Sequence, residues 1–294
     1  MTRTLIVGSG FVGRAVATRL AAAGDSPVLA SRHPLAAPPA PWVALDAADA
    51  TSCARVVDQV RPDRIVLVHG PSDVTWCEAN PQRAAELHTG AAANLTAAAP
   101  GCRTVLISTD NVFHGNSPAN DENTPTDPAN AYGRAKLAAE RILAAAPGNT
   151  VLRVSLVYGW EPAGSGKWLN FFSACAHNLR RGRPVEAPHD QWTTPVLVQD
   201  VAAVTAAVLA GGAPPLLHLG GPDRISRAAW AQAIADGLGA PRSLVLQVPK
   251  AVGRYASRPT NTCLTSDRLD RFLAPHRLQV RGVADGIRTL LEAP

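Results

Sequence analysis

Residues 4–13 have the sequence TLIVGSGFVG, in which a short, largely apolar run is followed at once by three glycines spaced as GxGxxG. Such a run is typical of a buried parallel strand, and helical periodicity from Val12 to Ala23 follows it. A loop of this kind lets the backbone approach a pyrophosphate, to which the helix N-terminus offers N–H donors. The stretch therefore predicts a dinucleotide site rather than an ordinary glycine-rich turn. Its candidate cofactor-binding residues are Gly8, Gly10, Phe11, Val12 and Gly13.

The rest of the first half continues to alternate between strands and helices. Because continuously apolar strands separated by helices form parallel sheets covered on both faces, the pattern predicts an α/β fold with a Rossmann-type doubly wound parallel sheet. Further strands are expected at residues 28–30, 42–45, 65–68, 105–107 and 151–154, with helices at 51–60, 81–99 and 131–146.

After about Val157 the pattern loosens, which indicates a smaller C-terminal lobe of α+β structure. Residues 1–157 are expected to form a nucleotide-binding Rossmann domain, and residues 158–294 mainly a substrate-binding lobe, with the active site between them. Within the second part, residues 195–212 are expected to return to the Rossmann domain. Helices are expected at 167–179, 201–209 and 226–238, with a strand at 216–219.

Composition favours a cytoplasmic protein that acts on small molecules. The 294 residues carry a net charge of +5, and their Lys and Arg residues are scattered, without the long basic run that would indicate nucleic-acid binding. No stretch approaches the roughly 20 apolar residues of a membrane span. The five cysteines are widely spaced and form no CxxC pair, so we expect reduced thiols and no bound metal.

The end of the second expected strand, residues 30–33 (ASRH), bears on the choice of nicotinamide cofactor. An NAD site usually has an Asp or Glu here for the ribose 2′-hydroxyl. Ser31 and Arg32 instead suit a 2′-phosphate, which favours NADPH, with a solvated loop arginine as the alternative. Three further candidate cofactor-binding residues are Asp46, for the adenine, and His69 and Gly70, along the ribose. The competing interpretation of Asp46 is a helix cap, and that of His69 is a core or loop histidine.

Tyr132 and Lys136, four residues apart at the start of an expected helix, follow Ser108 and Thr109 at a strand end. Reduction of a carbonyl by hydride needs an acid, and Tyr132 can serve if its pKa, about 10 unperturbed, falls toward neutrality. Lys136, one turn away, would stabilise the phenolate and reach the nicotinamide ribose. Thr109, or Ser108 beside it, would orient the substrate carbonyl. A surface Tyr and Lys on an amphipathic helix is the alternative.

At these residues the chain resembles the dTDP-4-dehydrorhamnose reductase family of extended short-chain dehydrogenases/reductases. That family's strand-end signature is STDYVFxG, and residues 108–115, STDNVFHG, depart from it only at Asn111. Similarity extends over essentially the whole chain. The other matching segments are residues 130–140, 152–159 and 190–195, with Asn170-Phe171 and Arg258-Pro259.

The resemblance implies that Thr109, Tyr132 and Lys136 form a catalytic triad in an NAD(P)-dependent oxidoreductase. The implied reaction is an NADPH-dependent transfer of hydride to the keto group of a nucleotide-activated deoxysugar, of the dTDP-4-keto-6-deoxyhexose type, with Tyr132 as general acid. The resemblance also implies a homodimer. The candidate substrate-binding residues are Ser108, Asp110, Asn111, Asn170, Phe171, Gln191, Trp192 and Arg258.

Departures from the family pattern keep other functions open. Asn111 replaces a tyrosine near the substrate, Thr194 stands where glycine is usual, and His88 where asparagine is common, so a different carbonyl substrate is one alternative. His88 could also join a water relay behind the catalytic lysine, although a satisfied core or helix-surface histidine is favoured. Arg32 argues against an epimerase, which typically retains NAD. The alternative from another class is a non-catalytic, NADP-binding regulatory subunit.

Overall fold

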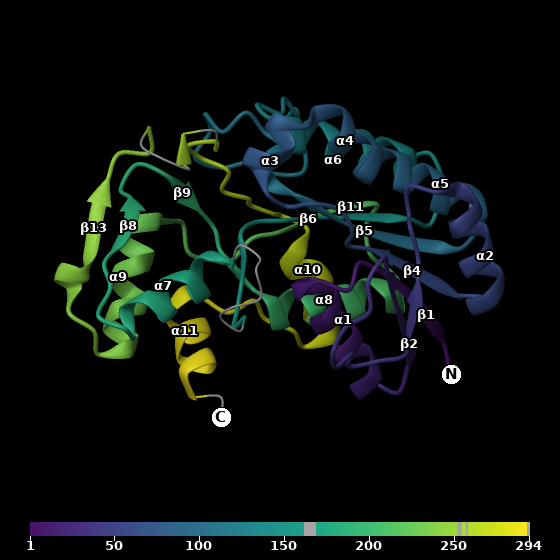
Figure 1. The fold of residues 1–294 in the computed structure, drawn as a ribbon, viewed down its shortest axis with the longest axis horizontal. Helices are drawn as coiled ribbons and strands as arrows, with labels where there is room; N and C mark the ends of the chain where they lie inside the picture. Colours follow the sequence, from purple (N-terminus) through teal and green to yellow (C-terminus); the bar gives the residue numbers. More distant parts are fainter. Residues whose placement is uncertain (162–168, 252–254, 257, 293–294) are drawn as a thin grey trace.

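The computed structural model describes residues 1–161, 169–251, 255–256 and 258–292. A sheet of seven strands forms its centre: β1 (Arg3–Val7), β2 (Ser26–Ser31), β3 (Trp42–Ala44), β4 (Arg64–Leu67), β5 (Arg103–Thr109), β6 (Thr150–Val154) and β11 (Leu216–Leu219). Neighbouring strands all run parallel, in the order β11-β6-β5-β4-β1-β2-β3 (Figure 1). This confirms the predicted doubly wound α/β fold.

Six helices cover the two faces of this sheet. They are α1 (Phe11–Ala22), α2 (Ala50–Val60), α5 (Ala91–Ala98), α6 (Ala131–Ala144), α8 (Val198–Ala210) and α10 (Leu269–Leu273). Because side chains alternate along a strand, Leu5 and Val7 of β1 pack with α2, α5 and α6. Ile6, between them, packs on the opposite face with α1, α8 and α10. An uninterrupted apolar strand is therefore what this position in the sheet requires.

The helix expected over residues 81–99 is interrupted in the structure. It consists of α4 (Pro81–Ala85), a π-helical turn η1 (Glu86–Gly90) and α5. A short helix that was not expected, α3 (Val74–Ala79), precedes it, and Asp73 caps this helix by accepting hydrogen bonds from the backbone amides of Thr75 (2.9 Å) and Trp76 (3.2 Å). π-helical turns are frequent at functional sites, and this one contains the buried His88.

The second lobe has a core of its own, to the left in Figure 1. Its helices are α7 (Phe171–Leu179), α9 (Arg227–Leu238) and α11 (Val283–Glu292), and its short strands pair as β8 (Val185–Pro188) with β13 (Val245–Val248), β9 (Trp192–Thr193) with β12 (Ile225–Ser226), and β7 (Val157–Tyr158) with β10 (Val196–Leu197). Trp230 lies at the centre, with its ring 5.2 Å from that of Tyr158 and 4.9 Å from that of Phe171. Strands of two to four residues are too short to show an alternating pattern, so the sequence did not reveal them. Part of the helix expected at 167–179 lies outside the described residues.

Three C-terminal segments, α8, β11 and α10, lie against the large sheet rather than in the second lobe. Helix α8 packs along α1, and β11 extends the sheet beyond β6. The described residues also include the 3-10 turns η2 (Asp110–Val112), η3 (Arg242–Leu244) and η5 (Ala274–His276). None of the helices in the described part of the chain is long and apolar enough to cross a membrane.

Candidate active site

The glycine loop between β1 and α1 is tightly packed on one side and open on the other. Gly8 has φ +114°, and a Cβ atom there would lie 2.8 Å from the Val68 carbonyl carbon. A Cβ atom at Gly13 would lie 1.8 Å from the Gly8 oxygen, whereas a Cβ atom at Gly10 would have no neighbour within 4 Å in the described part of the chain. Gly10 is also the N-cap of α1 and brings no capping side chain. This leaves backbone N–H donors and open space where a pyrophosphate would lie.

The next two residues of the loop begin α1. Phe11 lies against the chain after β7, since a Cβ atom at Gly159 would come within 2.9 Å of its ring. Val12 packs on the core of that face of the sheet. Their side chains therefore fix the start of the helix, and a ligand at this loop would meet mainly their backbone.

At the end of β2 the two candidate residues have different surroundings. The Ser31 hydroxyl accepts hydrogen bonds from Ser9 Oγ (2.7 Å) and Trp42 Nε1 (2.9 Å) and donates to the His33 carbonyl (2.8 Å). Ser31 therefore fastens the loop, and its expected role as a free donor to a phosphate is not supported. Arg32 is exposed beside it, where it can reach an anion.

The structure does not support the interpretation of Asp46 as the cap of the following helix. Asp49, not Asp46, is the N-cap of α2, and it accepts a hydrogen bond from the Thr51 amide (2.9 Å). Asp46 Oδ1 accepts from the Ala48 amide (3.1 Å) in the turn before the helix. The side chain of Asp46 is partly exposed at the end of the strand, so contact with adenine stays a prediction.

Strand β5 and helix α6 bring together the three predicted catalytic residues. Thr109 ends β5, and α6 begins beside it because Asn130 caps the helix, its Oδ1 accepting from the Gly133 amide (2.8 Å). Tyr132 is half-buried in the first turn, next to the Thr109 hydroxyl. Lys136, one turn on, is 3% exposed, and its Nζ donates to the Ile107 carbonyl (2.7 Å).

The protonation of this pair differs from the expectation in one respect. Burial lowers the pKa of Lys136 to about 8, with the nearby Glu140 carboxylate acting in the opposite direction. Burial also raises the pKa of the Tyr132 phenol above its ordinary range, and Asp110 adds to this rise. The expected lowering by Lys136 is therefore wrong for this arrangement, since its ammonium is bound to a strand carbonyl. A neutral phenol is nevertheless the form that a proton donor needs.

Two buried histidines lie behind the tyrosine. The His88 ring is 5.5 Å from that of Tyr132 and 6.1 Å from that of His69. His88 Nε2 bonds to the Pro71 carbonyl (3.0 Å), but its Nδ1 and both ring nitrogens of His69 are buried without a hydrogen-bond partner among the described residues. Burial and the charge of Lys136 lower the pKa of both rings, that of His69 to about 3, so both are neutral.

Gly70 holds the backbone against this pair. It has φ +93°, and a Cβ atom there would lie 2.2 Å from the His88 ring. His69 lies two residues after the end of β4 and adjoins the glycine loop, because a Cβ atom at Gly8 would lie 2.9 Å from its backbone nitrogen. Unpartnered ring nitrogens at this strand end are what a polar group of a bound cofactor would satisfy. The residues present thus fit a dinucleotide.

Sequence reasoning missed a buried polar network beneath the site. Ser108 Oγ donates to the Glu140 carboxylate, so the expected role of Ser108 toward substrate is not supported, and Thr109 is the hydroxyl beside the tyrosine. Glu140 also accepts from Arg153 Nε (3.1 and 3.2 Å) and Nη2 (2.7 Å). Arg153 Nη1 lies 3.3 Å from His218 Nε2, while His218 Nδ1 faces two backbone carbonyls. We infer that Nδ1 carries the proton and that Nε2 accepts from Arg153.

Asp110 and Asn111, expected to contact substrate, instead hold the strand end in place. Asp110 Oδ1 accepts from Asn111 Nδ2 (2.8 Å), and its Oδ2 accepts from Thr262 Oγ1 (2.7 Å) and Ser155 Oγ (3.3 Å). Asn111 Oδ1 accepts from Asn130 Nδ2 (3.0 Å). Burial raises the pKa of Asp110 while these hydrogen bonds act against the rise. Both side chains therefore connect β5 to α6 and to the C-terminal part of the chain.

The candidate substrate-binding residues of the second lobe differ in the contacts that they make. Asn170 caps α7, with Oδ1 accepting from the Ser173 amide (3.2 Å), and Phe171 is 6% exposed in the core of the lobe. Gln191 Nε2 donates to the Pro259 carbonyl (3.1 Å), and its Oε1 is buried without a partner among the described residues. The Arg224 guanidinium covers the Trp192 ring at 4.1 Å. Arg258 directly precedes Pro259 in the sequence.

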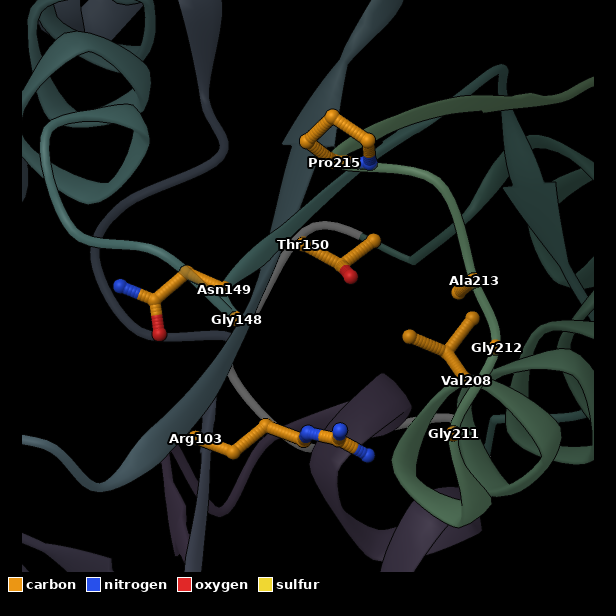
Figure 2. A pocket seen from close by; sticks show the side chains of 9 residues that line it. All are labelled: Arg103, Gly148, Asn149, Thr150, Val208, Gly211, Gly212, Ala213 and Pro215. Atoms are coloured by element: carbon orange, nitrogen blue, oxygen red, sulfur yellow. The ribbon is translucent and has the colours of Figure 1, made fainter.

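Two hollows lie away from Tyr132 and Lys136. One, of about 280 Å³, is at the amino edge of the sheet, where Figure 2 shows the Arg103 side chain pointing into it between Asn149 and Gly211. The other, of about 690 Å³, lies beyond the carboxyl end of β11 against α10. Neither is lined by Tyr132 or Lys136, so neither is the candidate active site.

The model of the RmlD substrate binding domain family matches residues 2–290, which is nearly the whole chain. The chain belongs to this family. The resemblance deduced from residues 108–140 is thereby confirmed, and it was carried by the strand-end hydroxyls and the Tyr-Lys helix rather than by the glycine loop alone.

Relatives of this RmlD-family chain include a reductase and a subunit of methionine adenosyltransferase. It is 30% identical to a dTDP-4-keto-6-deoxy-D-glucose reductase of Streptomyces niveus over 74% of the chain and 72% of that protein. It is 28% identical to methionine adenosyltransferase 2 subunit beta of Danio rerio over 73% of the chain and 68% of that protein. A crystal structure of dTDP-4-dehydrorhamnose reductase from Bacillus anthracis in complex with NADP superposes with a TM-score of 0.83, at 21% identity over 99% of both chains. This last likeness concerns the fold.

Proposed function

We propose that this protein is an NADPH-dependent reductase that transfers hydride to the keto group of a nucleotide-activated deoxysugar. The observation that carries the proposal is the meeting of Thr109, Tyr132 and Lys136 at the carboxyl edge of the sheet, next to a glycine loop left open at Gly10. Family membership and the reductase from Streptomyces niveus support the same reaction class.

The chain's residues would hold the cofactor along the carboxyl ends of β1, β2 and β4. Gly10 and the start of α1 would receive the pyrophosphate, and exposed Arg32 the 2′-phosphate, which favours NADPH over NADH. The Lys136 ammonium and the unpartnered His69 ring would serve the ribose. When bound, the cofactor supplies the hydride.

Thr109 and Tyr132 would act on the carbonyl oxygen. The Thr109 hydroxyl orients the oxygen by donating a hydrogen bond, and the neutral Tyr132 phenol gives up its proton as negative charge develops there. Lys136, charged below pH 8, donates to the Ile107 carbonyl and would hold the ribose of the bound cofactor. The second lobe, which we assign to residues 158–294 apart from the segments that lie against the large sheet, would bind the nucleotide end of the substrate.

A non-catalytic role is the second candidate, because methionine adenosyltransferase 2 subunit beta is among the relatives. The intact Tyr132 and Lys136 argue for catalysis, and one experiment separates the two functions. Purified protein is titrated with NADPH and NADH, and absorbance of the reduced cofactor is followed after addition of dTDP-4-keto-6-deoxyglucose. Oxidation of NADPH is the expected result. Tight NADPH binding without oxidation, over a panel of nucleotide-linked and simple ketones, would contradict the reductase and favour the binding subunit.

A further inference from the structure

The cavity of about 280 Å³ lies at the amino edge of the large sheet, the edge opposite to the one that carries Thr109. It is bounded by the starts of β5 and β6 and by the loop after α8 (Figure 2). Arg103, the first residue of β5, points into it. Because none of the nine residues that line the cavity is acidic, its wall carries a positive charge and no negative one.

The charge of Arg103 is not neutralised by a carboxylate in the described part of the chain. Among those residues, its Nη1 donates one long hydrogen bond, of 3.4 Å, to the Leu209 carbonyl in the last turn of α8. Arg64, its neighbour on β4, donates to the same carbonyl at 3.2 Å and pairs with Asp25 at 2.7 Å. The carbonyl is therefore satisfied without Arg103, and Asp25 is engaged by Arg64. Most of the five N–H donors of the Arg103 guanidinium stay available to a ligand.

Neutral donors complete the wall of the cavity. Thr150 is 6% exposed, and Figure 2 shows its hydroxyl oxygen turned toward the space into which Arg103 points. This hydroxyl has no hydrogen-bond partner among the described residues, and the amides of Gly212 and Ala213 donate to no acceptor among them either. Donors without partners are what the acceptor atoms of a ligand would satisfy. Gly212 also leaves the space open, since a Cβ atom there would have no described neighbour within 4 Å.

We propose that this cavity binds the phosphate group of a small phosphate monoester, at a site separate from the active site. The planar guanidinium of Arg103 matches two phosphate oxygens at once, and the hydroxyl and amide donors suit the third. Ligand pockets usually have volumes of about 300–1,000 Å³. A cavity of about 280 Å³ therefore fits a phosphate with a substituent of a few carbon atoms rather than a nucleotide. This inference is independent of the proposed reductase function.

The test is a calorimetric titration of protein saturated with NADPH, so that the phosphate-binding groups of the cofactor site are occupied. The probes are glycerol 3-phosphate and inorganic phosphate, with glycerol as the uncharged control. Arg103→Met and Thr150→Val are compared with Arg181→Met. Arg181 is a matched control, because it is exposed, lies outside the cavity and likewise donates to a carbonyl in the last turn of a helix, that of His177 in α7 (3.3 Å).

We expect glycerol 3-phosphate to bind the wild type with a Kd of about 1 mM or lower, more tightly than inorganic phosphate, and glycerol not to bind. Arg103→Met should weaken glycerol 3-phosphate binding by about 10-fold or more, because a charge-assisted pair is lost. Thr150→Val keeps the shape of the side chain and removes one donor, so it should weaken binding by about 3-fold or more. The control variant should bind like the wild type.

The thermal midpoint distinguishes phosphate binding from a purely structural role at the end of α8. Because Arg64 also donates to Leu209, Arg103→Met should shift the midpoint by less than about 2 °C. A lowered midpoint with unchanged affinity for glycerol 3-phosphate would overturn the proposal and leave Arg103 as a helix cap. Inorganic phosphate that binds as tightly as glycerol 3-phosphate would refute the monoester. Absence of binding of both probes to the wild type would refute the site.

Discussion

Removal of the Glu140 carboxylate is expected to destabilise the protein strongly. Glu140 and Arg153 are each 6% exposed and are joined by hydrogen bonds of 2.7 to 3.2 Å. Loss of one partner leaves the other charge buried, which costs about 3–5 kcal/mol, whereas replacement of both by apolar groups is often neutral. We therefore expect Glu140→Leu to lower the free energy of unfolding by about 3–5 kcal/mol, and addition of Arg153→Met to restore most of it.

Loss of the Glu140 charge should also change cofactor binding, through its effect on Lys136. The Glu140 charge raises the pKa of Lys136 against the effect of burial, so the isosteric Glu140→Gln should bring that pKa below 8. The assay is urea unfolding of the single and double variants, with NADPH titrations of Glu140→Gln between about pH 6 and pH 10. A loss of less than about 1 kcal/mol in Glu140→Leu, or a double variant that loses the sum of both single effects, would refute the buried pair as the source of stability.

Three further predictions concern the cofactor. NADPH affinity of the wild type should fall as pH rises through about 8, because the protonated fraction of Lys136 drops from about nine-tenths at pH 7 to about one-tenth at pH 9. Lys136→Met should lose this pH dependence. If the variant retains it, another group is responsible for the pH dependence. Gly10→Ala places its Cβ where no atom lies within 4 Å, so stability should change by less than about 1 kcal/mol while NADPH binds at least about 10-fold more weakly; unchanged affinity would place the pyrophosphate elsewhere. Arg32→Ala should reduce the preference for NADPH over NADH by about 10-fold in paired titrations, and an unchanged ratio would mean that another residue binds the 2′-phosphate.

Local patterns in the sequence were sufficient to predict the fold and the proximity of Thr109, Tyr132 and Lys136. Residues 4–13 combine a strand, a turn that only glycine fits and a helix start, so they determine the first β–α unit. Tyr132 and Lys136 are one helical turn apart, and the strand ending at Thr109 precedes them. Such features depend on spacing within one or two elements, which a sequence shows directly.

Features built from distant residues could not be predicted in this way. Ser108 donates a hydrogen bond to Glu140, 32 positions away in the sequence, and Asp110 accepts one from Thr262, 152 positions away. The sequence does not show these partners, so the Ser108 hydroxyl and the Asp110 carboxylate were expected to contact substrate. The fall expected for the pKa of Tyr132 depended on where the Lys136 ammonium points, and it points to a strand carbonyl.

The most direct test of the central claim is the rate of NADPH oxidation by Tyr132→Phe in the presence of the ketosugar. This variant keeps the ring against His88 and removes only the hydroxyl that would protonate the carbonyl oxygen. We predict that turnover falls by about 10²–10⁴-fold while the Kd for NADPH stays within about twofold of the wild type. Turnover equal to that of the wild type would contradict the assignment of Tyr132 as the general acid.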